Sequence, residues 1–255
     1  MNQRACLFGA ALLLACAASQ TPIASAQVLS LDGQWLLAVD PANAGLAGEW
    51  WTAPRPDAKP TKVPWIIQDA FPGYHGVAWY WREFAAPANL RRDGVPTSNA
   101  GRDGVPTSGR GRYLLRFWAV DYTAEVWLNG VRAGSHEGGE SPFVLDVTDA
   151  IRAGAPNRLA VRVLNPTTEP IDGISLYQTA RRCKVMPFGA GAIFNHGGIT
   201  GSVDLFCVPA VRLDDLFVIA SPAQTTGKIH VQAVVQNAAP QAQKGYVEFT
   251  VASAR

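Results

Sequence analysis

The sequence has little charge, and neither sign dominates. Charged residues make up 16% of the 255 residues, and 22 basic side chains nearly balance 20 acidic ones. Nucleic acids and anionic membranes are bound through an excess of positive charge, so this balance gives no reason to expect either partner. The 4 histidines are far apart and show no metal-ligand spacing such as His-Glu-x-x-His. The sequence therefore predicts no metal site and no cofactor.

Long apolar runs are also scarce. The stretch at residues 5–18 is shorter than the roughly 20 residues that a bilayer-spanning helix needs. It is followed at 24–26 by Ala-Ser-Ala, the small-x-small pattern of a signal peptidase site. We therefore expect residues 1–26 to be a signal peptide and the protein to be exported, to a periplasm or the outside. The alternative is a lipoprotein signal, because Leu-Leu-Ala precedes Cys16, and lipid on Cys16 would then attach the protein to a membrane.

Cysteine is rare beyond that segment. Only Cys183 and Cys207 lie after residue 26. In an oxidising compartment the two could close a disulfide loop, and the alternative is a pair of free, buried thiols. Sequence spacing leaves both alternatives open because it does not report the separation of the two Cα atoms.

Helical periodicity is nearly missing, and a period of two replaces it. Residues 113–120 and 158–163 alternate between apolar and polar side chains, as half-buried strands do. Asn129-Gly130 stands between two further strand patterns and suits the two positive φ angles of a type I′ turn, so we expect a hairpin there. Strands with frequent Gly and Pro breaks predict an all-β sandwich or jelly roll.

A second domain is expected to begin near Pro209. New strand patterns follow at 210–218, 228–236 and 245–251. Three strands are fewer than the roughly seven of an immunoglobulin-like sandwich. The predicted organisation is a signal peptide at 1–26, a jelly-roll domain at 27–209 and an incomplete immunoglobulin-like domain at 210–255.

An ordered set of motifs covers about residues 31–219. It comprises Leu-Asp-Gly-Gln-Trp at 31–35, Val-Pro-Trp at 63–65, Trp-Tyr-Trp-Arg-Glu-Phe at 79–84, Ala-Glu-Val-Trp-Leu-Asn-Gly at 124–130, Gly-Ser-His-Glu-Gly-Gly at 134–139, Pro-Phe-Val-Leu-Asp-Val-Thr at 142–148 and Asn-Arg-Leu-Ala-Val-Arg-Val at 157–163. In this order and spacing the motifs resemble the N-terminal sugar-binding domain of glycoside hydrolase family 2. The resemblance implies a galactose-binding-like jelly roll, then an immunoglobulin-like domain and a (β/α)₈ barrel.

In the resembling family the barrel hydrolyses a β-glycosidic bond with retention, through two glutamates whose carboxyl groups lie about 5–5.5 Å apart. The acid/base glutamate follows an Asn, and this sequence has no Asn-Glu dipeptide and no alternating βα pattern. We therefore assign no catalytic residue and expect an accessory, sugar-binding part of an exported family 2 enzyme that is inactive alone. The alternative is a free-standing secreted carbohydrate-binding module, with Trp50, Trp51 or Trp65 stacking on sugar rings. Either way the expected partner is a β-linked carbohydrate.

One irregular stretch, residues 165–201, is a candidate sugar-facing edge, because long loops in compact domains are often functional. In the resembling family the corresponding region leans toward the barrel. The candidate substrate-binding residues there are Asp172, Lys184, Asn195 and His196. The alternative is a disulfide-tied loop of solvated polar side chains. At 198–201 the chain has Gly-Ile-Thr-Gly, where many family members have an aromatic residue followed by Arg.

Overall fold

The computed structural model describes residues 27–87, 111–179, 195–222 and 227–249. The expected signal peptide, with Cys16, lies outside these residues, as do Lys184 and Cys183. The regular secondary structure of the described chain is nearly all strand, as predicted. Its elements are β1 (Gln27–Ser30), β2 (Gly33–Asp40), β3 (Lys59–Val63), α1 (Ile67–Ala70), β4 (Gly76–Ala85), β5 (Arg112–Phe117), β6 (Val120–Asp121), β7 (Thr123–Leu128), β8 (Val131–Glu137), β9 (Phe143–Asp146), β10 (Pro156–Asn165), the 3₁₀ turn η1 (Leu176–Gln178), β11 (Gly198–Ile199), β12 (Val203–Val208), β13 (Val211–Pro222) and β14 (Gly227–Asn237).

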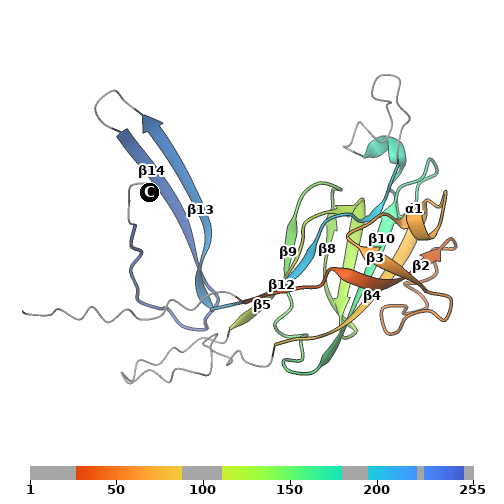
Figure 1. Ribbon diagram of the computed structural model, residues 1–255, viewed down its shortest axis with the longest axis horizontal. Helices are drawn as coiled ribbons and strands as arrows, with labels where there is room; N and C mark the ends of the chain where they lie inside the picture. Colours follow the sequence, from red (N-terminus) through yellow and green to blue (C-terminus); the bar gives the residue numbers. More distant parts are fainter. Residues whose placement is uncertain (1–26, 88–110, 180–194, 223–226, 250–255) are drawn as a thin grey trace, which may run out of the picture.

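Two antiparallel sheets form a sandwich (Figure 1). One has four strands in the order β1-β12-β5-β9, and the other has six in the order β3-β2-β4-β10-β7-β8. A short β6–β11 pair lies beside them. β10 lies centrally in the larger sheet, bonded to β4 on one side and to β7 on the other. Sequence-distant segments are thereby placed around this one strand.

The core between the sheets follows the predicted alternation. Leu159, Val161 and Val163 on β10 are fully buried, and they face Leu115 and Phe117 of the smaller sheet in one cluster. Successive side chains of a strand point to opposite faces, so these odd positions share the inner face. The prediction for 158–163 is confirmed, and that for 113–120 is confirmed as far as Phe117, where β5 ends.

The Asn129-Gly130 turn also forms as predicted. Both residues have positive φ, 53° and 85°, and Leu128 pairs directly with Val131. Positive φ at both central positions is the requirement of a type I′ turn, which Asn and Gly meet at low cost. The turn fixes the register of β7 against β8.

A second apolar cluster covers the outer face of the six-stranded sheet. Trp79 and Trp81 on β4 and Trp127 on β7 are buried there. The loop at 41–58 brings Trp50 and Trp51 onto this cluster, and Trp51 stacks on Trp127 with ring centroids 5.3 Å apart. Trp127 is therefore part of the core. Trp50 and Trp51 are half-buried covers of the sheet, whereas Trp65 is 48% exposed.

The C-terminal part differs from the expectation in one respect. β13 and β14 pair along their length and extend away from the sandwich in Figure 1. Residues 245–249 form no strand, although the pattern predicted one at 245–251, of which 250 and 251 lie outside the described residues. A strand needs a partner for its backbone hydrogen bonds, and residues 245–249 pair with no strand of the described chain. In the described part of the chain, no helix is long and apolar enough to cross a membrane.

Candidate functional site at the end of β10

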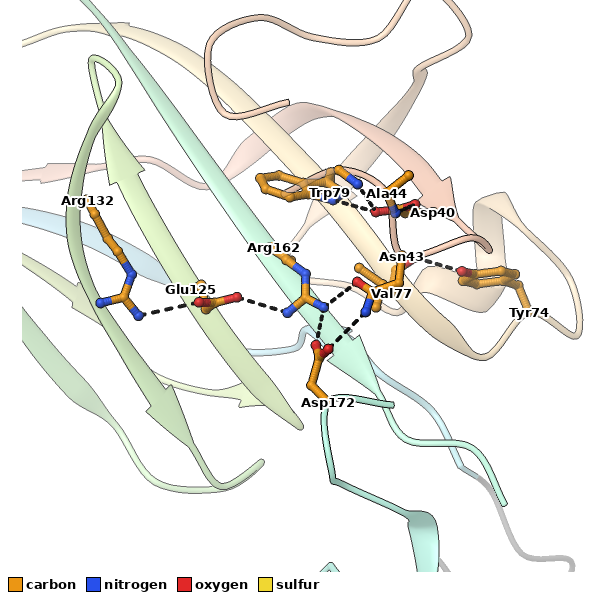
Figure 2. A network of polar contacts seen from close by, with 11 residues as sticks. Asp40, Asn43, Ala44, Tyr74, Val77, Trp79, Glu125, Arg132, Arg162 and Asp172 are labelled. Carbon is orange, nitrogen blue, oxygen red and sulfur yellow. Dashed lines mark hydrogen bonds and ion pairs between the residues drawn. The ribbon is translucent and has the colours of Figure 1, made fainter. Parts of the chain in front are cut away.

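Arg162 is the centre of a charged network on the outer face of β10. Its side chain is 4% exposed. Nη1 donates to Glu125 Oε2 at 2.9 Å, and Nη2 donates to Asn43 Oδ1 at 2.6 Å and to Asp172. Figure 2 shows these side chains converging from β7, the loop after β2 and the segment after β10. One guanidinium thus ties three separate segments together.

Asn43 and Asp172 complete the network from two tight turns. Asn43 Nδ2 donates to Asp172 Oδ1 at 2.9 Å, and both residues have positive φ, 52° and 51°. Asn and Asp tolerate this left-handed region better than other non-glycine residues. Burial alone would raise the pKa of Asp172. The hydrogen bonds from Arg162 and Asn43, together with the charge of Arg162, outweigh burial, so the pKa lies below its ordinary value. Asp172 is therefore an ionised partner of Arg162.

A second network occupies the end of β10. Asn165 is fully buried, and its Oδ1 accepts a hydrogen bond from Gln68 Nε2 at 2.8 Å and lies 2.9 Å from His75 Nδ1. Its Nδ2 donates to Asn195 Oδ1 at 2.9 Å, and Asn195 Nδ2 donates to the Pro166 carbonyl at 2.7 Å. The side chain of Asn165 thereby holds α1, the Tyr74–His75 turn and residue 195 at one end of the sandwich.

Two glycines let the returning chain approach closely. A Cβ on Gly197 would lie 2.4 Å from the side chain of Asn165. Gly198 has φ +135°, and a Cβ there would lie 2.8 Å from Tyr80 Oη and 2.9 Å from the Trp65 carbonyl. Larger residues would displace the 195–199 segment from this end of the sheet.

The structure separates the candidate sugar-facing residues. Asp172 bonds to Arg162 and Asn195 to Asn165, two β10 residues whose odd and even positions point to opposite faces of the sheet. His196 is exposed, and Lys184 lies outside the described residues. Asp172 and Asn195 thus belong to different networks, and contact of the four candidate residues with a substrate stays a prediction.

Sequence reasoning missed the central residues of both networks. Arg162 was placed in a strand but given no role, although an Arg among buried valines must find a charged partner. Asn165 and His75 gave no signal beyond polarity at a strand end. Among the described residues, no group of three or more His, Cys, Asp or Glu side chains is arranged to hold a metal ion.

The candidate disulfide is untested. Cys207 is buried on β12, and burial raises the pKa of its thiol to about 11. Because Cys183 lies outside the described residues, the pairing of the two stays a prediction.

Comparison with known proteins identifies the sandwich. Residues 28–209 match the family model described as "Glycosyl hydrolases family 2, sugar binding domain". The chain belongs to glycosyl hydrolase family 2. The matched range runs from β1 to the end of β12 and contains both β10 networks.

Relatives of this family 2 chain carry the name β-glucuronidase. The mouse protein (Mus musculus) is 27% identical over 234 residues, which are 83% of this chain and 33% of the relative. The human protein (Homo sapiens) is 28% identical over 232 residues, again 83% and 33%. A solved β-glucuronidase from an uncultured Clostridium species superposes with a TM-score of 0.63 at 27% identity, covering 82% of this chain and 34% of that one. The family 2 chain thus spans about a third of the length of the relatives it matches.

Proposed function

We propose that this chain is the accessory sugar-binding part of a β-glucuronidase that hydrolyses β-glycosidic bonds with retention, and that catalysis lies in a domain beyond it. The observation that carries the proposal is the match of residues 28–209 to the family 2 sugar-binding domain, within relatives three times as long that are named β-glucuronidases. The substrate class is accordingly a β-linked glucuronide.

Three carboxylates near the outer face of the six-stranded sheet support the view that this chain does not supply the catalytic pair. Asp172 and Glu125 are bound to Arg162, and Asp40 accepts hydrogen bonds from the backbone of Ala44 and Gly45. Retaining hydrolysis needs one carboxyl group free to take and give a proton and another free to attack carbon. Carboxylates that bind a guanidinium or backbone amides stabilise the fold and are not free for either catalytic role.

The role proposed for the chain is to present one end of the sandwich to the catalytic domain. The Asn165 network and the Arg162 network fix the segments before and after the 180–194 stretch at that end. A fixed edge can position a substrate without reacting with it, which reduces the entropy lost on binding.

Activity of the chain alone and of the complete reading frame that contains it tests the proposal. We expect no hydrolysis of an aryl β-D-glucuronide by this chain, and hydrolysis with retained anomeric configuration by the longer protein, followed by NMR of the first-formed sugar. Hydrolysis by the chain alone would place catalysis here. A longer protein inactive on every β-glycoside would remove the proposed function.

We also propose that the protein is exported through residues 1–26. The support is the apolar stretch and the Ala-Ser-Ala site before Gln27, where the first strand begins. Mass spectrometry of the protein recovered from its host should give Gln27 as the first residue. A lipid-modified Cys16 would indicate the lipoprotein alternative, and an intact Met1 in the cytoplasm would contradict export.

A further inference from the structure

A pocket of about 300 Å³ lies at the opposite end of β10 from the Asn165 network. Arg158, which lines it, precedes Asn165 by seven residues, about 23 Å at the rise of a β-strand. The loop at 41–58 contributes Trp51 and Thr52 to the wall, and the β7–β8 turn contributes Asn129. The size is at the lower end of small-molecule pockets, about 300–1,000 Å³.

Two hydrogen-bonded asparagines, of which Asn157 is buried, hold the third wall of this pocket. Asn157 is 2% exposed and binds both backbone groups of Arg152: its Oδ1 accepts from the Arg152 N–H at 2.8 Å, and its Nδ2 donates to the Arg152 carbonyl at 2.9 Å. Asn129 Nδ2 donates to the same Oδ1 at 2.8 Å and also to the Ala150 carbonyl. The backbone of Arg152 is therefore fixed beside the pocket before any ligand arrives.

The charges of the pocket do not cancel. Arg158 Nη2 lies 2.8 Å from Glu83 Oε1, so the charges of Arg158 and Glu83 neutralise each other. Arg158 Nη1 also donates to the Thr52 carbonyl at 2.6 Å. Arg152 also lines the pocket, and within the described ranges its guanidinium has no hydrogen bond or ion pair. One positive charge is left, and a guanidinium fork matches a carboxylate in two parallel hydrogen bonds.

An aromatic surface accompanies that charge. Trp51 lines the pocket, and its indole is stacked on that of Trp127 with the rings 9° from parallel. An aromatic ring offers a large apolar contact area and loses little side-chain freedom on binding. Stacking on Trp127 already restricts Trp51, so binding would cost it still less freedom.

We propose that this pocket binds a sugar carrying a carboxylate, a hexuronate residue, as a glycan subsite separate from the proposed catalytic function. The carboxylate binds Arg152, the apolar C–H groups of the ring lie against Trp51, and hydroxyl groups donate to Glu83. The choice of a sugar over other carboxylates rests on the proposed function; the requirement for a carboxylate rests on the unpaired charge of Arg152.

Titration of the purified chain with methyl β-D-glucuronide and with methyl β-D-glucoside, followed by calorimetry, tests the proposal. The two glycosides differ only in the carboxylate, so we expect the glucuronide to bind about tenfold more tightly, the value of a hydrogen-bonded charge pair. Arg152→Glu removes the preference. Arg55→Glu is the matched control: Arg55 belongs to the same loop as Trp51 but lies over Trp50 and outside the pocket, and this change leaves the preference intact.

Equal binding of the two glycosides, no binding of either at millimolar concentrations, or equal effects of the two substitutions would each overturn the proposal. Circular dichroism of both variants checks that they remain folded, which we expect because both side chains lie at the surface. This proposal and the proposed function can fail independently. Hydrolysis by the longer protein does not require this pocket, and binding of a glycoside to this chain does not require catalysis.

Discussion

The sandwich and the β13–β14 hairpin use similar strands in opposite surroundings. β10 is buried on both faces, by the inner core and by the tryptophan cluster. β13 and β14 carry neighbouring apolar side chains such as Phe217 and Val218, which are 56% and 53% exposed. Adjacent strand residues point to opposite sides, so both faces of this hairpin are apolar and open. A two-stranded sheet without a covering layer is marginally stable in water, so we expect the hairpin to be less stable than the sandwich.

Removing a buried tryptophan should show the largest difference between the two regions. Trp79 is fully buried in the outer cluster, so Trp79→Ala should lower the free energy of unfolding by about 3–5 kcal/mol. Phe217→Ala, in the hairpin, should lower it by less than about 1 kcal/mol. Urea unfolding followed by tryptophan fluorescence measures both. Similar losses for the two variants would mean that the hairpin is as well covered as the sandwich.

Amide hydrogen exchange should separate the regions without any substitution. Amides of β10 should exchange only through unfolding of the sandwich, whereas those of β13 and β14 open locally. We expect β10 to exchange at least about a thousandfold more slowly, a difference of about 4 kcal/mol in opening. Mass spectrometry of peptides from residues 156–165 and 227–237 gives the ratio, and equal protection would contradict the contrast.

The Arg162 network should contribute less than the tryptophans but more than surface charges. Arg162→Met leaves Glu125 and Asp172 without their buried cation, and since these partners are partly exposed we expect a loss near the lower limit for buried pairs, about 3 kcal/mol. Arg132→Met is the control, because Arg132 also binds Glu125 but is 53% exposed. It should cost less than about 1 kcal/mol. If the two variants lose equal stability, burial does not set the value of the network.

The smallest effect concerns pH. The pKa of Asp172 is lowered in the folded state, so its contribution is complete above the unfolded value, near 3.8, and is lost as pH falls through the lower folded value. Asp172→Asn should therefore reduce the loss of stability below about pH 4, by less than about 1 kcal/mol because the side chain is 42% exposed. Unfolding curves at pH 7 and at pH 3 for both proteins measure the change. An unaltered pH dependence would mean that the ion pair does not form in solution.

Local patterns predicted the fold and gave little of the candidate site. Alternation fixed the inner faces of 113–117 and 158–163, and Asn129-Gly130 fixed a turn, because each depends only on neighbouring residues. The Arg162 network depends on residues 43, 125 and 172, which are brought together only when β7, β10 and two loops have folded. The prediction of a strand at 245–251 shows the same limit, because the local pattern was present but residues 245–249 pair with no strand of the described chain.

The pairing of β1 with β12 has a mechanical consequence. Gln27 is the first residue of β1, and it pairs with Cys207, the second-to-last residue of β12. The chain therefore enters and leaves the sandwich at neighbouring positions. Force applied between these two points would peel the strands apart one hydrogen bond at a time, instead of loading the whole ladder in shear. A sandwich pulled from its two chain ends would therefore lose the β1–β12 hydrogen bonds in sequence, starting at Gln27. The six-stranded sheet, which the tryptophan cluster covers, would bear none of the initial load.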